Sequence, residues 1–175
     1  MEFNDMRNER LILRKAIGAD LDGIVALKTD PAIRRFLGGA APVARVRAKL
    51  LVDGLKSVTA DSGAFVVASA RTNEMLGMVT LDRRPPQRPG HVRPEGNELE
   101  LSYLLLPAHW GHGFAYEACE LLLKSAEAAW PGEVVLVVTQ TANAAAVALA
   151  TRLGFEHVDS FEEFGAPQWL GARTL

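Results

Sequence analysis

Apolar and polar residues alternate along this chain with two periodicities, one typical of strands and one typical of helices. Strand-like runs cover residues 10–15, 64–70, 75–82, 98–106, 134–139, 155–164 and 168–174. Apolar residues at helical spacing cover residues 21–28, a short segment after Pro31, and residues 42–60, 113–130 and 143–153. Helices interleaved with strands predict an α/β (α+β) fold in which helices cover a mixed sheet.

Turn-forming residues sharpen several of these boundaries. Residues 71–74 (Arg-Thr-Asn-Glu) separate two β-rich runs and predict a hairpin. Pro131 and Gly132 are expected to stop one helix, and Gly154 the last one. Residues 134–139 are so uniformly apolar that the pattern predicts a strand buried on both faces.

The size and composition of the chain indicate one compact domain spanning residues 1–175. The chain has 49% hydrophobic and 23% charged residues, enough for a substantial core. A net charge of -2 gives no electrostatic reason to expect a nucleic-acid partner. No segment has the apolar length of a membrane span, and the charged amino terminus does not resemble a signal peptide, so we expect no membrane partner and a cytoplasmic location.

The only cysteine, Cys119, cannot form an intramolecular disulfide, which is typical of a reducing compartment. It lies at the spacing of a buried helical face, and we interpret it as a core residue and not as a nucleophile. His109 and His112 are not accompanied by the cysteines or carboxylates of a tetrahedral site, so no metal is expected.

The segment 104–118 joins a predicted strand to a predicted helix through a turn in which Gly111 and Gly113 flank His112. Main-chain N–H groups in the first turn of a helix lack intrahelical acceptors, and the helix dipole attracts anions to that end. Glycines let successive amides turn toward one ligand, so the segment predicts a phosphate site. The alternative is an ordinary strand-to-helix turn that needs two flexible positions.

Together with residues 98–106 and 143–155, this turn resembles the GNAT superfamily of acyl-CoA-dependent N-acetyltransferases. The family's turn reads Gln/Arg-x-x-Gly-x-Gly/Ala; residues 110–115 (Trp-Gly-His-Gly-Phe-Ala) match its second half and depart at Trp110. That tryptophan, and the segments 8–14 and 30–38, resemble the ribosomal-protein N-terminal (RimJ/RimL-like) acetyltransferase branch. The resemblance covers nearly the whole chain.

The resemblance implies a GNAT fold, with a central mixed, mostly antiparallel sheet and helices on both faces. The strands at 98–106 and 134–139 would splay apart, and the pantetheine arm of acetyl-CoA would lie between them. The acceptor would be a primary amine, either a protein or peptide N-terminus or a small amine, and the closing hairpin leaves a homodimer open. The residues implied in cofactor binding are Leu104, Leu105, Leu106, Trp110, Gly111, His112, Gly113, Phe114, Ala115 and Asn143. A plain helix cap is the alternative for Asn143.

Acetyl transfer requires an unprotonated amine, and therefore a proton acceptor. Glu100 matches a glutamate frequent in the family, and it can also attract a cationic amine; Glu98 lies one pleat repeat away. The alternative is that both are solvated charges at a strand end. Main-chain groups near Tyr103 are implied to bind the arm and the thioester oxygen.

The departing thiolate lacks an obvious proton donor. Ala150 stands where many family members have a tyrosine, and Ala146 where the branch often has a serine. Water, Tyr103, Ser102 or Tyr116 would then serve instead. The competing hypothesis is a catalytically weakened acyl-CoA sensor or an interaction module on the same fold.

The segment 83–97 holds four arginines and four prolines, which excludes a place inside the sheet. It is either a flexible flap that borders the acceptor site or touches an anionic partner, or a solvated connector.

Overall fold

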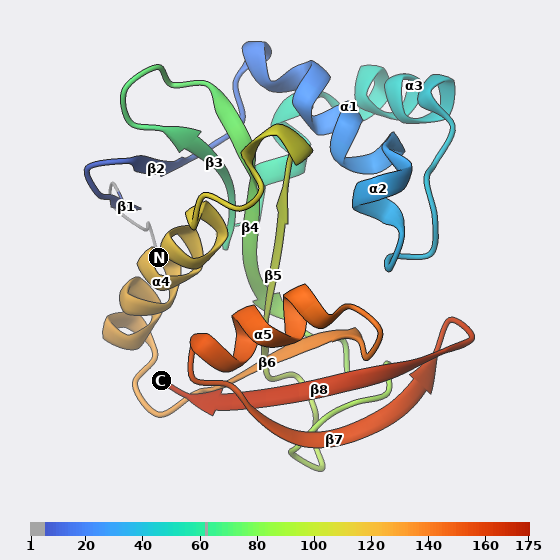
Figure 1. The fold of residues 1–175 in the computed structure, drawn as a ribbon, viewed down its shortest axis with the longest axis vertical. Helices are drawn as coiled ribbons and strands as arrows, with labels where there is room; N and C mark the ends of the chain where they lie inside the picture. Colours follow the sequence, from blue (N-terminus) through green and yellow to red (C-terminus); the bar gives the residue numbers. More distant parts are fainter. Residues whose placement is uncertain (1–5, 62) are drawn as a thin grey trace.

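The computed structural model describes residues 6–61 and 63–175. The prediction that the amino terminus is not a signal peptide falls partly on the first five residues, which lie outside this range. Eight strands form one sheet in the order β1-β2-β3-β4-β5-β6-β8-β7 (Figure 1). The strands are β1 (Met6–Arg7), β2 (Leu11–Arg14), β3 (Ala64–Ser69), β4 (Met75–Arg83), β5 (Leu99–Leu105), β6 (Val134–Gln140), β7 (Glu156–Glu163) and β8 (Ala166–Thr174). Neighbouring strands are antiparallel except β5 and β6, so the predicted mixed, mostly antiparallel sheet is confirmed.

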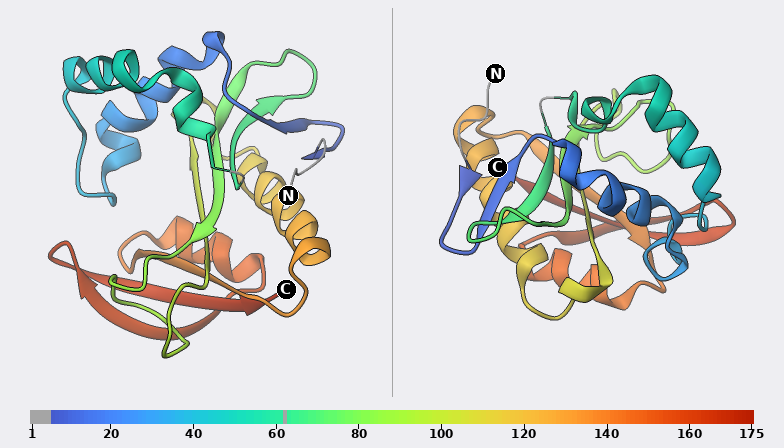
Figure 2. Two further views of the ribbon diagram at one scale, coloured as in Figure 1. Left: turned by 180° about the vertical axis from the view of Figure 1, so that it is seen from behind. Right: turned by 90° about the horizontal axis from the view of Figure 1, so that it is seen from above.

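Helices cover both faces of the sheet (Figure 2). They are α1 (Leu21–Thr29), α2 (Pro31–Arg34), α3 (Val43–Asp53), α4 (Phe114–Ala129) and α5 (Ala144–Arg152), and the 3₁₀ turns are η1 (Gly18–Asp20), η2 (Leu55–Thr59) and η3 (Pro107–His109). Within the described ranges, no helix has the length and apolar character needed to cross a membrane.

Two apolar clusters bind the helices to the sheet. On one face, Ile24 of α1 and Leu50 of α3 pack with Val66 of β3. On the other, Leu122 of α4 and Ala150 of α5 pack with Val135 of β6. Because side chains alternate along a strand, successive residues of β5 face different clusters, which later separates the candidate site residues.

The parallel strands β5 and β6 pair only at Leu99 with Val135 and at Glu100 with Leu136. Beyond these pairs, β5 runs on to Leu105 and β6 to Gln140 without pairing with each other, and in Figure 1 β6 crosses the view while β5 continues upward. The predicted splay of these strands is therefore confirmed. It leaves main-chain groups of β5 without a neighbouring strand.

The short strand β1 was not predicted, and two predicted elements differ in extent from those in the structure. The helix expected over residues 42–60 ends at Asp53, because Gly54 has a φ of 76° that no α-helix accommodates, and a 3₁₀ turn follows. The strand expected to be buried on both faces is buried only at residues 135–137, because β5 departs and leaves residues 138–140 partly exposed. The closing hairpin forms as predicted, with β7 paired to β8.

Candidate active site

The glycine turn presents a row of main-chain donors at the first turn of α4. Gly111 has a φ of 76° and Gly113, the residue before the helix, a φ of 80°, so both adopt the left-handed conformation that glycine tolerates best. In the described part of the chain, the amides of residues 111–116 donate to no protein acceptor. A Cβ at either glycine would meet no protein atom within 4 Å. The glycines are therefore needed for the backbone conformation and leave room in front of the amides.

A cation that the sequence analysis did not select lies beside this turn. Arg10 donates to the main-chain oxygen of His112 at 2.7 Å, pairs with Glu117 at 3.1 Å and lies over the Phe114 ring. The His112 ring in turn stacks on Phe114. The only signal in the sequence was the resemblance of residues 8–14, since 102 residues separate Arg10 from its hydrogen-bond partner. The site thus gains a positive charge next to its free amides.

The end of β5 offers fewer free main-chain groups than the sequence implied. The Leu106 amide donates to Leu76 of β4, and by the alternation of an antiparallel ladder Leu104 also turns toward β4. Leu105 turns the other way, but the Trp110 indole donates to its oxygen at 2.8 Å. This leaves the amide of Leu105, and by the same alternation the main chain of Tyr103, directed toward the diverging strand β6.

Asn143 caps α5, since its side-chain oxygen accepts from the Ala146 amide at 3.3 Å. Its side-chain nitrogen has no protein partner in the described part of the chain. The cap and a cofactor contact are thus compatible, because they use different atoms.

Glu100 is held in an ion pair. The guanidinium of Arg84, whose side chain is 0% exposed, donates to a Glu100 oxygen at 2.8 Å. The same guanidinium donates to the Pro89 oxygen and lies 3.7 Å from Glu163 at the end of β7. Glu100 is therefore not a solvated strand-end charge.

Glu98 is a buried anchor for the segment 83–97. It accepts hydrogen bonds from the Val92 and Arg93 amides, both at 2.8 Å, and contacts the His91 ring at 2.5 Å. Burial alone would raise its pKa, but these hydrogen bonds outweigh burial and hold the pKa of Glu98 below its usual value. Together, Arg84 and Glu98 fasten the segment to β5, although most of its other residues are exposed.

Tyr103 and Glu100 face opposite sides of the sheet. Tyr103 packs against the α4 and α5 cluster, and its hydroxyl donates to the Ala146 oxygen at 3.0 Å. Burial, with a smaller contribution from Cys119, raises the pKa of the Tyr103 phenol, which makes it a weaker acid. Glu100 shares its face with Ser102, which is exposed. The two residues predicted to be catalytic therefore do not meet on one surface.

A second carboxylate, missed by the sequence analysis, lies across from Glu100. Asp82 of β4 is the cross-strand partner of Glu100. Burial, followed by the charge of Asp61, raises the pKa of Asp82; Lys15 acts in the opposite direction. No motif marks Asp82 in the sequence, because only the pairing of β4 with β5 places it there.

The remaining sequence candidates fall outside this chemistry. Cys119 is buried in the helix core, and burial raises the pKa of its thiol. Within the described residues, no group of three His, Cys, Asp or Glu side chains is arranged to hold a metal ion.

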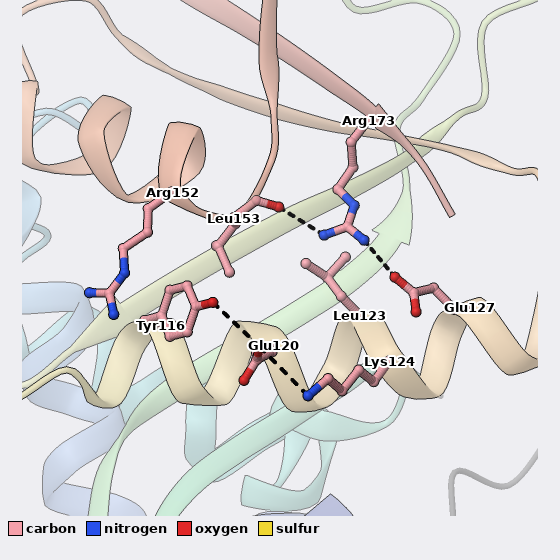
Figure 3. A pocket seen from close by; sticks show the side chains of 8 residues that line it. All are labelled: Tyr116, Glu120, Leu123, Lys124, Glu127, Arg152, Leu153 and Arg173. Carbon is pink, nitrogen blue, oxygen red and sulfur yellow. Dashed lines mark hydrogen bonds and ion pairs between the residues drawn. The ribbon is translucent and has the colours of Figure 1, made fainter.

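A polar pocket between α4, α5 and β8 is braced by its own side chains. Arg173 donates to the Leu153 oxygen and to Glu127, and Tyr116 donates to Glu120 (Figure 3). Arg152, at the end of α5, lies over the Tyr116 ring. These contacts fix α5 against the first turn of α4, and so fix the glycine turn relative to β6.

Comparison with known proteins places these features in a family. The model of the acetyltransferase (GNAT) domain matches residues 10–156. A search of curated proteins finds no match to this chain.

Solved structures share the fold at low sequence identity. A GNAT-family acetyltransferase from Bacillus anthracis superposes with a TM-score of 0.75 at 15% identity, covering 96% of both chains. Spermidine N-acetyltransferase from Vibrio cholerae, solved with CoA and spermine, has a TM-score of 0.71 at 19% identity, covering 95% of this chain and 96% of the other. An acetyl transferase from Salmonella typhimurium that modifies the N-terminal serine of ribosomal protein L7/L12 has a TM-score of 0.70 at 16% identity, covering 96% of both.

Proposed function

The chain belongs to the GNAT acetyltransferase family, and on this premise we propose that it transfers the acetyl group of acetyl-CoA directly to a primary amine in a ternary complex. The observation that carries the proposal is the row of free amides at residues 111–116. These amides follow the end of β5, where β5 no longer pairs with β6. A diphosphate at those amides directs the pantetheine arm along the unpaired edge of β5.

The diphosphate contacts are assigned to Gly111, His112, Gly113, Phe114 and Ala115, with Arg10 supplying charge. Free amides at a helix start favour an anion, and a guanidinium beside them adds a charge-assisted contact. Trp110 supports the turn through its hydrogen bond to β5, and Asn143 contributes its free side-chain nitrogen.

The thioester oxygen is assigned to the amides of β5 that face away from β4, at Tyr103 and Leu105. A fixed N–H directed at this oxygen strengthens its bond as the carbonyl becomes tetrahedral. Leu104 and Leu106 can contact the cofactor only through their side chains, since their main-chain groups are directed toward β4. Holding both substrates together supplies the proximity that direct attack requires.

The acceptor amine is assigned to the face of β5 that carries Glu100 and Ser102. A carboxylate fixed in place by its ion pair with Arg84 attracts an ammonium group and orients it. Tyr103 is assigned to holding α5 against β5, because its hydroxyl is already bonded to Ala146 and its raised pKa opposes proton donation. The thiolate of CoA is a tolerable leaving group, and water serves as its proton donor.

Two acceptor types are compatible with this assignment, a polyamine or other small amine and a peptide N-terminus. The relatives described above include one protein of each type by their names. We propose a cytoplasmic location for the reaction, in keeping with a lone reduced cysteine.

The function is tested in two steps. Calorimetry with acetyl-CoA is expected to give saturable binding, and thiol release is then measured with spermidine, benzylamine and peptides that begin with serine or alanine. Acetylation of at least one amine is the expected result. Binding without thiol release on any acceptor supports the acyl-CoA sensor, which the alanines at 146 and 150 favour. No binding of acetyl-CoA contradicts both the transferase and the acyl-CoA sensor, and favours the interaction module.

A further inference from the structure

We propose that Asp82 of β4 accepts the proton of the acceptor amine, while Arg84 keeps Glu100 as a fixed carboxylate that orients the same amine. This inference rests on the acetyl transfer proposed above and adds a catalytic residue to it. It divides between two residues the roles that the sequence analysis gave to Glu100 alone.

The first support is position. Asp82 and Glu100 are cross-strand partners, so their side chains leave the same face of the sheet about 5 Å apart at the Cβ atoms. Glu100 is also the last residue of β5 that pairs with β6, so the two carboxylates lie where the strands begin to diverge. An ammonium group above β5 at this level lies within reach of both.

The second support is the environment of Glu100. A proton on Glu100 would remove the negative charge that faces the fully buried Arg84 guanidinium. An uncompensated buried charge is strongly unfavourable, and Glu163, at 3.7 Å, replaces the contact only in part. The ion pair with Arg84 therefore suits Glu100 to orienting the ammonium group and leaves the proton to another carboxylate.

The third support is the environment of Asp82. Its carboxylate has no hydrogen bond or ion pair within the described part of the chain. The charged groups that face it are Lys15 from the segment after β2, Asp61 from the loop before β3 and Glu100 from β5. Lys15 is occupied by the main-chain oxygens of Asp61 and Ala64. Asp82 is thus left free to take up a proton.

This arrangement matches a general pattern in which neighbouring carboxylates have different environments and divide acid–base roles between them. Burial, followed by the negative charges of Asp61 and Glu100, raises the pKa of Asp82. The carboxylate of Asp82 is therefore a stronger base than that of a free aspartate. Glu100, meanwhile, remains an ion-pair partner of Arg84.

The ammonium group gives one proton to the Asp82 carboxylate, and the freed nitrogen lone pair forms a bond to the thioester carbon. The carbon–sulfur bond then breaks, and the nitrogen loses a second proton through water to the departing thiolate. Asp82 returns its proton to solvent, so the products are the amide, free CoA and one released proton.

The test compares three variants on an amine that the wild type acetylates. Asp82→Asn is expected to lower kcat by about 10²-fold or more and to remove the acidic limb of the pH profile of kcat/KM. Asp61→Asn is expected to shift that limb to lower pH while keeping most of the rate, because it removes a charge that raises the pKa of Asp82. Glu100→Gln is expected to raise the KM for the amine and to keep the limb, moved to lower pH by less than in Asp61→Asn because Glu100 contributes less to the raised pKa of Asp82.

An unchanged limb in Asp82→Asn, or a limb lost in Glu100→Gln instead, overturns the proposal. Calorimetry with CoA on each variant shows whether the cofactor site is intact, and circular dichroism shows whether the variant is folded.

A second measurement does not depend on the acceptor. Carboxyl ¹³C titration of the CoA-bound protein is expected to show Asp82 protonating above the ordinary aspartate range, and to move it downward in Asp61→Asn. Protonation of Asp82 within the ordinary range overturns the proposal. If the wild type acetylates no amine, the proposed function fails by itself, whereas acetylation that survives Asp82→Asn with its pH profile unchanged refutes only the role of Asp82.

Discussion

At the scale of single residues, the two glycines of the turn are required for their backbone conformation and not because a side chain would clash there. Gly111 and Gly113 have open space around them, so the requirement is one of φ and not of volume. The left-handed conformation costs a residue with a Cβ about 1–2 kcal/mol. That conformation turns the following amides outward.

Gly113→Ala is expected to raise the Kd for CoA about tenfold, because relief of strain rotates the amides of the first turn of α4 away from the diphosphate. Calorimetry with CoA measures the change. Gly132→Ala is the matched control, since Gly132 has a φ of 82° and equally open surroundings but lies in the α4–β6 turn. It should lose similar stability and keep its affinity for CoA; equal loss of affinity in both variants would contradict the assignment of the turn.

At the scale of elements, the segment 83–97 shows how buried charges hold a proline-rich loop in place. Arg84 ties it to β5 and β7, and Glu98 receives the amides of Val92 and Arg93. The segment thus forms a fixed part of the structure next to Glu100. Its position does not depend on regular secondary structure.

Arg84→Ala is expected to reduce the free energy of unfolding by about 3–5 kcal/mol, because it leaves Glu100 as a partly buried carboxylate without its partner, whereas Glu163 keeps its ion pair with Arg88. Urea denaturation followed by circular dichroism measures the loss. Arg93→Ala is the comparison, since the Arg93 side chain is 40% exposed and its ion pair with Glu133 is long, at 4.0 Å. This variant should lose less than about 1 kcal/mol of the free energy of unfolding. Similar losses in the two variants would mean that Arg84 does not anchor the segment.

The lowered pKa of Glu98 predicts a defined acid sensitivity. A carboxyl whose folded pKa lies below its unfolded value contributes stability that is present above the unfolded pKa, near 4.3, and is lost as the pH falls through the folded pKa. The Tm of the wild type should therefore fall more steeply below about pH 4.3 than that of Glu98→Gln, which has no charge to lose at this site. Parallel Tm curves for the two proteins would show that Glu98 does not contribute this stability.

At the scale of the whole molecule, one sheet is divided by the divergence of β5 from β6 while the helices on its faces keep both halves in contact. The core on the α4 and α5 side contains residues from strands on both sides of the divergence, including Leu101 and Val135. Cys119 lies inside this core. It is therefore a reporter of global opening. The oligomeric state, for which the closing hairpin left a homodimer open, is not decided by this core.

The Cys119 thiol is expected to react with a disulfide reagent at pH 8 only as fast as the protein opens, because it is buried and its pKa is raised. Acetyl-CoA at 100 times its Kd should slow the reaction about 100-fold, the kinetic equivalent of about 2.7 kcal/mol of ligand stabilisation. The chain in urea provides the fully reactive reference. Rapid labelling of the native protein would contradict the burial of this residue.

The sequence alone determined most of the elements and the position of the glycine turn, because both depend on local information. Hydrophobic periodicity set the order of strands and helices, and the glycines at 111 and 113 indicated an anion site before any contact was known. The splay of β5 from β6 came from the family resemblance. Where local signals conflicted, as at Gly54, the predicted boundary was wrong.

The tertiary structure alone decided which charges meet. Arg10 reaches the turn from another strand, Arg84 makes Glu100 an ion-pair partner, and Asp82 is opposite Glu100 only through the register of β4 and β5. Alternation along β5 also separated Tyr103 from Glu100, although they are three residues apart. Electrostatic environment depends on burial and on distances between segments far apart in the chain, and the sequence contains neither directly.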